Sequence, residues 1–223
     1  MKGKISEIFE SIQGEGIYVG ERQIFVRFFG CNLSCAFCDT PLNNFSEYDP
    51  LELLNELKSY QGDFHSISFT GGEPLLQKEF LKETLILVKQ EGFRNYLETN
   101  GTLPEALNEV IEYVDIVAMD FKLPTSTRTG DFWLIHRDFL KIASKKEVFL
   151  KAVICSSSEE EDFKNGLEII KEISPNVRLV LQPNSFEYGG TLNEKIEEFK
   201  TACLREKIAV CLIPQMHKIM GIK

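Results

Sequence analysis

The chain has 223 residues, of which 43% are hydrophobic and 26% are charged, a composition typical of folded globular proteins and not of disordered ones. Its formal net charge of −9 repels phosphate backbones, and no basic stripe offsets it, so we expect no nucleic-acid partner. The N-terminal MKGKISEIFESIQGEG lacks the apolar core of a signal peptide, and no apolar run approaches the roughly 20 residues that cross a membrane. We therefore expect a cytoplasmic protein with reduced cysteines and a small-molecule substrate.

Short apolar segments alternate with longer amphipathic ones along the whole chain. In chain order we expect strands at residues 23–29, 66–69, 95–99, 115–121, 147–154, 177–182 and 208–213. Between them, apolar residues recur at three- and four-residue spacing, which predicts helices at residues 49–60, 78–92, 103–114, 158–173 and 191–207. This alternation predicts an α/β fold with a parallel sheet and right-handed crossovers. Neither a repeat nor a linker divides the chain, so we expect residues 1–223 to form a single domain.

Polar and glycine-rich segments follow five of the expected strands, namely GCNLSCAFCDT, TGGEP, ETNG, KLP and QPNS. In parallel α/β sheets, ligands gather at the carboxyl ends of the strands. We therefore expect these five segments to meet in one active site. The acidic run Glu159–Asp162 is instead expected to be the solvated first turn of a helix. The three histidines share no spacing that is typical of metal ligands.

Three of the six cysteines, Cys31, Cys35 and Cys38, form a C-x3-C-x2-C pattern. A structural zinc site needs four ligands, and the remaining cysteines are not paired at zinc-finger spacing. A redox dithiol in CAFC is a second alternative, but the helix start expected just after such a motif is missing. An iron–sulfur cluster held by three thiolates leaves one iron free to bind a small molecule. We expect the other three cysteines to be small buried apolar residues, namely Cys155, Cys203 and Cys211.

The cysteine pattern, with the aromatic Phe37 just before its last cysteine, resembles the signature of the radical S-adenosylmethionine (SAM) superfamily. FTGGEP at residues 69–74 resembles the second element of that superfamily, and its glycines permit a close approach of backbone and ligand. The resemblance implies a [4Fe-4S] cluster on the three cysteines. It also implies that the amino and carboxylate groups of SAM bind the fourth iron, which accounts for the missing fourth cysteine.

A longer segment, EIFESIQGEGIYVGERQIFVRFFGCNLSCAFCDT at residues 7–40, resembles the N-terminal part of the 7-carboxy-7-deazaguanine synthase family. ETNG at 98–101, QP at 182–183 and QMHK at 215–218 match that family in the same order. The chain departs from it at AMDFKLP, residues 118–124, where a Ser-Pro-Lys turn is more usual. The resemblance implies an incomplete (β/α)6-type radical SAM partial barrel.

The resemblance also implies a reaction. It is the radical-mediated ring contraction of 6-carboxy-5,6,7,8-tetrahydropterin to 7-carboxy-7-deazaguanine with loss of ammonia, a lyase step in queuosine biosynthesis. The SAM cofactor supplies the radical, so no side chain is expected to be catalytic in its own right. Further implied partners are Mg2+ on Thr40, a reductant such as flavodoxin or ferredoxin, and a second copy of the chain in a homodimer. Judged from the residue alone, Thr40 is a simple cap of its turn.

Two groups of site residues follow from the resemblance. Contacts with SAM are expected from Phe37, Gly72, Glu73, Asp120, Phe121, Lys122, Gln182, Pro183, Asn184 and Ser185. Contacts with the pterin are expected from Ile12, Gln13, Gly14, Glu15, Arg27 and Thr70. In particular, Glu73 is expected to face the SAM amino group, and Arg27 to pair with the substrate carboxylate as a bidentate fork. A structural salt bridge from Arg27 to Glu15 or Glu21 is the alternative.

Two other functions are compatible with three clustered cysteines. A glycyl-radical-enzyme activase, or another short radical SAM enzyme, uses the same cysteine motif but acts on a different substrate. A non-catalytic iron–sulfur or zinc-binding protein is the more remote alternative. QGEG at residues 13–16 is not expected in an activase, and TGGEP has no purpose in a protein that does not bind SAM.

Overall fold

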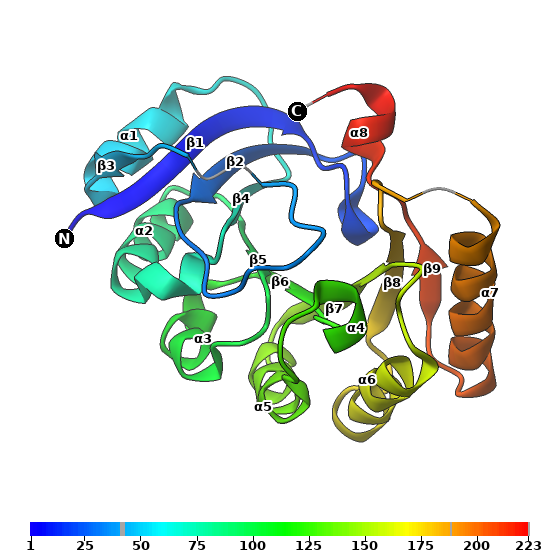
Figure 1. Cartoon of the computed structure of the whole chain (residues 1–223). Helices are drawn as coiled ribbons and strands as arrows, with labels where there is room; N and C mark the ends of the chain where they lie inside the picture. The colour runs from blue at the N-terminus through cyan, green and yellow to red at the C-terminus, as the bar shows by residue number, and fades with distance from the viewer. Residues whose placement is uncertain (41–42, 188, 223) are drawn as a thin grey trace.

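The computed structural model describes residues 1–40, 43–187 and 189–222 (Figure 1). Its strands form one nine-stranded sheet in the order β3-β1-β2-β4-β5-β6-β7-β8-β9. Seven of them run parallel, from β2 to β9, while β1 pairs antiparallel with β2 and β3 pairs antiparallel with β1. The strands are β1 (Gly3–Ile12), β2 (Arg22–Phe28), β3 (Ser46–Tyr48), β4 (Ser66–Gly71), β5 (Asn95–Thr99), β6 (Ile116–Asp120), β7 (Glu147–Ile154), β8 (Arg178–Pro183) and β9 (Val210–Leu212).

Six of the parallel strands are each followed by a long helix within the described residues. These helices are α1 (Pro50–Ser59), α2 (Lys78–Gln90), α3 (Pro104–Val110), α5 (Trp133–Ala143), α6 (Glu160–Ile173) and α7 (Gly190–Arg205). They lie on the outer side of the curved sheet, and the sheet does not close because β3 and β9 are its edges (Figure 1). The predicted α/β partial barrel of six strand–helix units is therefore confirmed. None of the described helices is long and apolar enough to cross a membrane.

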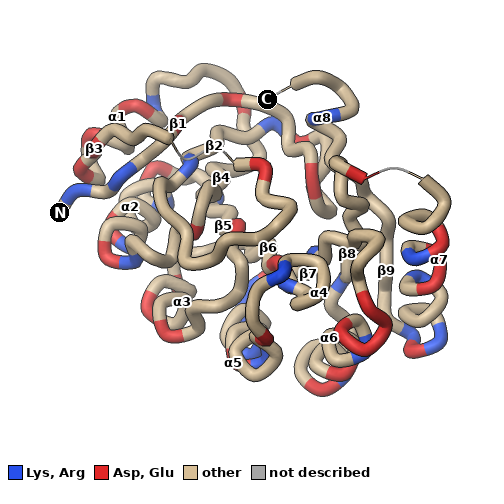
Figure 2. The backbone as a smooth tube through the Cα atoms, viewed as in Figure 1, with Lys and Arg blue, Asp and Glu red and all other residues tan. Residues whose placement is uncertain are grey.

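Shorter helical segments occupy the loops. They are α4 (Pro124–Thr127), α8 (Met216–Met220) and the 3-10 turns η1 (Gly16–Tyr18), η2 (Pro74–Gln77) and η3 (Ile111–Tyr113). Acidic and basic residues both occur along α5, α6 and α7, and the first turn of α6 is acidic, with Glu160, Glu161 and Asp162 (Figure 2). The charge is thus spread over the helices, which agrees with the absence of a basic stripe in the sequence.

The two faces of each strand serve different layers, since successive side chains point to opposite sides of a sheet. Residues such as Leu97 and Leu150 point outward and pack beneath the helices in the main hydrophobic core. Their neighbours Tyr96 and Phe149 point inward and form a smaller apolar cluster inside the curve of the sheet. The turn η1 packs against this inner cluster through Ile17 and Tyr18. The interior of the partial barrel is therefore filled at this level.

Most predicted elements are confirmed, and two strands match their predicted bounds, β5 and β7. The sequence predicts no strand before residue 23, and β1 shows why. Its apolar residues Ile5, Ile8, Phe9 and Ile12 recur at helical spacing, and a β-bulge between Ile5 and Glu7 breaks the strand alternation. The short edge strand β3 and the helix α5 were also missed; α5 begins without a side-chain cap hydrogen bond that could mark its start.

Gly16 permits a test of the packing inside the barrel. Its φ is +67°, and a Cβ there would lie 2.6 Å from the ring of Phe149. We expect Gly16→Ala to lose about 1–2 kcal/mol of unfolding free energy to the left-handed backbone and about 1–3 kcal/mol more to overpacking. Gly92 also has a positive φ, +85°, but open space around its Cβ position, so Gly92→Ala should lose only the backbone part. Urea unfolding measures the free energy of unfolding of both variants. Equal losses in the two would contradict the close packing of position 16 against Phe149.

Candidate active site

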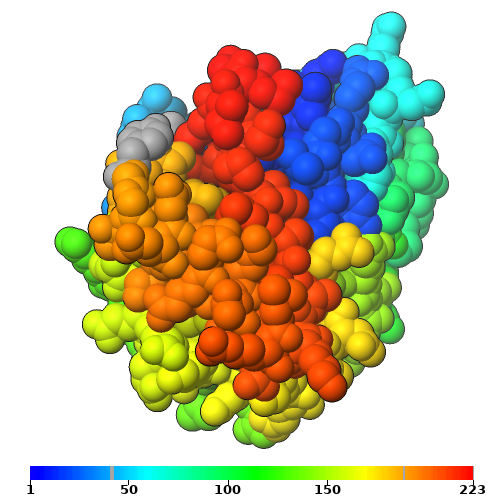
Figure 3. Space-filling model, turned by 90° about the vertical axis from the view of Figure 1, so that its right-hand side faces the viewer, coloured from blue at the N-terminus to red at the C-terminus, as the bar shows by residue number. Residues whose placement is uncertain are grey.

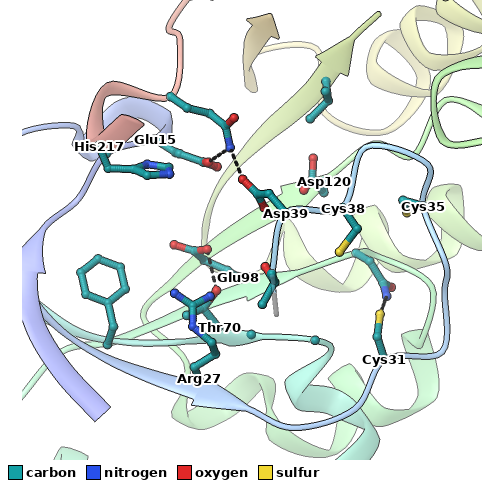
Figure 4. A pocket seen from close by; sticks show the side chains of 18 of the residues that line it. Glu15, Arg27, Cys31, Cys35, Cys38, Asp39, Thr70, Glu98, Asp120 and His217 are labelled. Atoms are coloured by element: carbon teal, nitrogen blue, oxygen red, sulfur yellow. Dashed lines mark hydrogen bonds between the residues drawn. The ribbon is translucent and has the colours of Figure 1, made fainter. Parts of the chain in front are cut away.

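A layer of polar side chains lies above the inner apolar cluster, one strand position further along. The inner apolar cluster holds one residue from each of four strands, namely Tyr96, Ala118, Phe149 and Val180. Two positions further along the same strands, the inward residues are polar, namely Glu98, Asp120, Lys151 and Gln182. Because a strand places residues i and i+2 on the same face, these four polar groups lie together at the carboxyl ends of parallel strands. They line one cavity of about 690 Å³ (Figure 4). The sequence thus builds an apolar floor with a polar site on top of it.

Most residues that the sequence predicts for the site line this cavity. From the pterin group these are Ile12, Gln13, Gly14, Glu15, Arg27 and Thr70. From the SAM group they are Phe37, Gly72, Asp120, Lys122, Gln182 and Asn184. The three cluster cysteines and the proposed magnesium ligand line it as well, namely Cys31, Cys35, Cys38 and Thr40. One cavity thus brings together segments from both ends of the chain.

Four predicted residues do not line the cavity. Glu73 is fully buried, and its carboxylate accepts hydrogen bonds from the backbone amides of Leu75 and Asn100 at 3.1 and 2.8 Å. Phe121 is buried in the main core. Pro183 is the last residue of β8. The Ser185 hydroxyl accepts a hydrogen bond from the Lys218 ammonium at 2.7 Å. Glu73 therefore ties the end of β4 to the end of β5 from behind the cavity wall.

The three predicted cluster cysteines lie on the loop that follows β2. All are free thiols, with Cys31 and Cys38 exposed and Cys35 partly exposed (Figure 4). Within the described ranges, no three His, Cys, Asp or Glu side chains gather closely enough to hold a single metal ion. A four-iron cluster does not require such a gathering, because each thiolate binds a different iron. The other cysteines lie elsewhere, and Cys155 and Cys203 are buried as expected. The expectation is wrong for Cys211, which is partly exposed because it lies on the edge strand β9.

Four charged side chains form a chain of ion pairs across the cavity. The Lys151 ammonium pairs with the Glu15 carboxylate and lies 3.6 Å from Asp120, which in turn pairs with Lys122 at 2.9 Å. Burial would raise the pKa of Glu15, but Lys151 and the Gln215 amide outweigh it and lower the pKa to about 2. Burial would likewise lower the pKa of Lys151, yet Asp120 and Glu15 raise it. Glu15 and Lys151 are therefore both charged at neutral pH.

Glu98 joins the QGEG loop to the sheet. This loop, residues 13–16, is predicted to contact the substrate and is called the substrate loop below. One carboxylate oxygen accepts a hydrogen bond from the Gln13 amide at 2.9 Å, and the other accepts one from the Thr70 hydroxyl at 2.8 Å. Gln13 also accepts a hydrogen bond from the backbone amide of Glu15 at 3.0 Å and donates one to Gln23 at 3.0 Å. QGEG therefore has its shape fixed by a buried amide side chain that contacts a carboxylate on β5.

Arg27 lies on the open side of the cavity, on β2. Its guanidinium is 3.5 Å from the Glu7 carboxylate and 5.5 Å from the centre of the Phe9 ring. Phe9 stacks on Phe25 with 5.1 Å between ring centres. The ion pair is thus with Glu7 and with neither of the acids considered from the sequence. Side-chain exposure of 23% and 33% for Arg27 and Glu7 leaves the guanidinium accessible from the cavity.

The C-terminal segment closes over the substrate loop. The Gln215 amide donates to Glu15 at 2.7 Å and to Asp39 at 3.1 Å, and Lys218 pairs with Asp39 at 2.5 Å. The backbone amide of Met216 donates to the carbonyl of Gly14 at 2.9 Å. In the space-filling view the red C-terminal atoms accordingly pack beside the blue N-terminal ones (Figure 3). This segment therefore completes the cavity from the far end of the chain.

Several cavity residues are absent from the predicted set. The main ones are Asn100, Lys151, Glu98, Asp39, Gln215, His217 and Lys218. A signal for two of them existed, since a charged residue inside the apolar strands NYLET and EVFLKAVI is unusual unless it faces a site. ETNG and QMHK were noticed as segments, but their side-chain directions depend on the fold.

Some polar atoms at the cavity have no hydrogen-bond partner among the described residues. They include the Gln182 side-chain oxygen, on a residue only 2% exposed, and one Asp120 carboxylate oxygen. Buried polar atoms are normally paired, so these atoms are suited to donors supplied by a ligand. Three thiols, unpaired acceptors and several fixed charges around one cavity fit an iron–sulfur cluster with a polar, amino-acid-bearing cosubstrate.

Comparisons with known proteins agree with this site. Residues 25–183 match the family described as the Radical SAM superfamily. A 7-carboxy-7-deazaguanine synthase of Methanothermobacter thermautotrophicus is 45% identical and aligns with 100% of this chain and 99% of its own length. The enzyme of that name from Geobacter sulfurreducens is 37% identical, over 98% of this chain and 97% of its own.

A solved structure agrees with the fold. The crystal structure of QueE from Escherichia coli superimposes with a TM-score of 0.67 at 21% identity, covering 95% of this chain and 94% of that one. The relatives decide between the alternatives that the cysteine pattern left open, because they match along the full length and not at the cysteines alone. The chain belongs to the radical SAM superfamily and, within it, to the family of 7-carboxy-7-deazaguanine synthases.

Proposed function

We propose that this chain converts 6-carboxy-5,6,7,8-tetrahydropterin to 7-carboxy-7-deazaguanine, with loss of ammonia, as a step of 7-deazapurine (queuosine) biosynthesis. The observation that carries this proposal is the shared cavity. The cysteine loop and the QGEG loop both line it, and its volume is about 690 Å³. A pterin edge presents both hydrogen-bond donors and acceptors. The cavity wall offers partners for both, because its ammonium groups donate, its carboxylates accept and its side-chain amides do both. The names of the full-length relatives support the same product.

On the cosubstrate side, Cys31, Cys35 and Cys38 hold three irons of a [4Fe-4S] cluster in this proposal. Together with SAM, the bound cluster supplies the 5′-deoxyadenosyl radical that begins the reaction. The glycine at position 72 leaves room for backbone contact with the methionine part. The unpaired Gln182 oxygen and Asn184 receive the donors of the nucleoside part.

The turn that departs from the family pattern keeps a role in binding. The Lys122 ammonium lies 5.6 Å above the Phe37 ring and pairs with Asp120. In this proposal the Lys122 charge faces the SAM carboxylate, and Phe37 contacts the adenine. Of the four predicted residues that lie off the cavity, Glu73 acts through Asn100 and Leu75, whose backbone amides it holds at the strand ends. For Phe121, Pro183 and Ser185 a direct SAM contact stays a prediction.

On the substrate side, Glu15 contacts the pterin edge and Arg27 pairs with its carboxylate. The Gln13 side chain, which is bonded to Gln23, Glu98 and the Glu15 backbone, fixes the loop that carries Glu15. The Thr70 hydroxyl and Glu98 complete this half of the site, because Glu98 fixes both Gln13 and Thr70. The ion pairs of Lys151 hold Glu15 as a carboxylate, so that it accepts from the amino group of the pterin. The segment around Gln215 excludes water from this side.

Further partners belong to the same proposal. Mg2+ binds at Thr40, which lines the cavity; such an ion takes oxygen ligands and retains several waters. A flavodoxin or ferredoxin supplies the electron, and two copies of the chain form a homodimer in the cytoplasm. Each of these partners has its own test in metal analysis, in reduction assays and in solution mass measurements.

Turnover tests the function directly. Anaerobically reconstituted protein with SAM, a reductant and 6-carboxytetrahydropterin should form 7-carboxy-7-deazaguanine and ammonia in equal amounts, as measured by mass spectrometry and an ammonia assay. Replacing any of the three loop cysteines by Ala should abolish both products, because the cluster then loses an iron ligand. The buried Cys155→Ala variant is the matched control and should keep its iron. Formation of 5′-deoxyadenosine without the deazaguanine, even at saturating pterin, would contradict the substrate assignment.

Arg27→Lys tests the carboxylate contact. A point charge cannot replace the planar fork, so we expect the pterin KM to rise at least tenfold, about 1.4 kcal/mol of binding free energy. Iron content and SAM cleavage without pterin should be unchanged. Arg22→Lys on the same strand is the matched control, because Arg22 pairs with Glu10 away from the cavity. If Arg27→Lys instead unfolds the protein or lowers its iron content, Arg27 is a structural residue.

Glu73 gives a pH-dependent stability. Burial raises its pKa to about 7 in spite of the hydrogen bonds from Asn100 and Leu75, compared with 4.5 for an ordinary glutamate. The folded protein therefore favours the protonated form. The protonated Glu73 side chain therefore adds to the free energy of unfolding. This addition is fully present below pH 4.5 and is lost as the pH rises to about 7, a change of about 3 kcal/mol. In urea unfolding, the difference between wild type and Glu73→Gln should shift by this amount over that range.

The matched control is Glu83→Gln on the exposed face of α2, which makes the same change of charge on the surface. The difference between wild type and this variant should not follow the profile of Glu73→Gln. A wild-type advantage over Glu73→Gln that is constant from pH 4.5 to 7 would show that Glu73 is not protonated on folding.

A further inference from the structure

Asn100 lies at the end of β5 and has every polar atom engaged. It is 5% exposed, and its backbone amide donates to the Glu73 carboxylate at 2.8 Å. Its side-chain oxygen accepts two hydrogen bonds from Thr102, from the backbone amide at 3.0 Å and from the hydroxyl at 2.6 Å. Two donors at that oxygen settle which end of the amide is which, so the amide nitrogen faces the other way, toward the cysteine loop.

That nitrogen contacts two residues of the loop. It donates to the Asn32 side-chain oxygen at 2.9 Å and lies 3.9 Å from the Cys31 sulfur, which the close-up shows as a dashed line (Figure 4). The Cys31 sulfur also accepts from the backbone amide of Leu33 at 3.4 Å. Among the residues that the structure describes, no such donor reaches the sulfur of Cys35 or Cys38. Of the three thiols, Cys31 therefore lies in the most donor-rich surroundings.

We propose that Asn100 is a positioning residue for the cluster: its amide donates to the Cys31 thiolate and raises the reduction potential of the bound iron–sulfur centre. The inference rests on the proposed function, in that it requires a cluster on the three cysteines. One-electron reduction adds a negative charge to the cluster. A donor that faces a sulfur favours the more negative state, and hydrogen bonds to the sulfurs are among the factors that set such potentials.

The network also fixes where the donor lies. Asn32 donates to the Thr102 hydroxyl at 2.8 Å, so the loop and the end of β5 are linked by a closed set of hydrogen bonds through Asn100. Behind it, the His136 ring lies 3.3 Å from the carbonyl of Asn100, in an aromatic environment with Phe121. The amide is therefore held from three sides before any cluster binds.

Asn100→Leu tests this role, since leucine has a similar size and no donor. Potentiometric titration of the reconstituted cluster, followed by electron paramagnetic resonance without pterin, should show a lower potential. We expect the ratio of reduced to oxidised cluster at a fixed poise to fall about tenfold, which for a one-electron couple is about 59 mV. Asn100→Ser, a smaller change that also removes the amide, should shift the potential in the same direction and serves if the leucine variant does not fold.

The matched control is Asn32→Ala, which removes the loop-side partner but keeps the Asn100 donor. In the apoprotein, hydrogen exchange of residues 30–36 should become faster in both the Asn32 and the Asn100 variants. Only the Asn100 variants should shift the potential. An unchanged potential in a loaded Asn100 variant, or an equal shift in Asn32→Ala, overturns the inference. Because no pterin is present, failure of the proposed substrate leaves these readouts as they are.

Discussion

The ion pair between Lys151 and Glu15, with Asp120 on its other side, is the contact on which the rest of the site depends. A lone ammonium at this depth would cost several kcal/mol of solvation free energy. The two carboxylates compensate for that loss, and the pairing keeps Glu15 and Lys151 in their charged forms. Since Glu15 belongs to the substrate loop and Lys151 to β7, the same contact also joins that loop to the barrel. A neutral residue at position 151 would leave the buried Glu15 carboxylate without its ammonium partner.

This charged layer exists because the inward side chains of several strands change from apolar to polar at the same height in the barrel. Below it the inward positions are apolar and filled by Tyr96, Phe149 and the turn η1, so water does not reach the site from beneath. Above it the next inward position of each strand is polar. The result is a cavity that apolar side chains close at the bottom. Charged side chains lie directly above them, and the C-terminal segment covers part of the opening. Such a site suits a reactive radical, which must meet its substrate and little else.

The sequence predicted the parallel sheet and the cysteine loop because both depend on local patterns, the alternation of elements and the spacing of thiols. It did not predict Glu98 and Lys151 as site residues, because a strand buried on both faces forms one apolar run, in which the charged residue is the single sign of the side that faces the site. Gln215 was out of reach for another reason. Its contact with Glu15 joins residues 200 positions apart, and only the closed fold brings them together.

Residues 29–40, the part of the cluster loop that carries the cysteines, contain no helix or strand, yet a cluster requires its three sulfurs at defined positions. Side-chain and backbone contacts with three rigid elements replace a helix or strand here. Asn32 is held at the end of β5, the backbone of Ala36 donates to Thr127 of α4 at 2.9 Å, and Asp39 pairs with Lys218 of α8. The first two elements belong to the barrel, whereas no residue of α8 is buried. The loop is therefore fixed firmly where Cys31 and Cys35 lie. At Asp39 its position is coupled to that of α8 through Lys218.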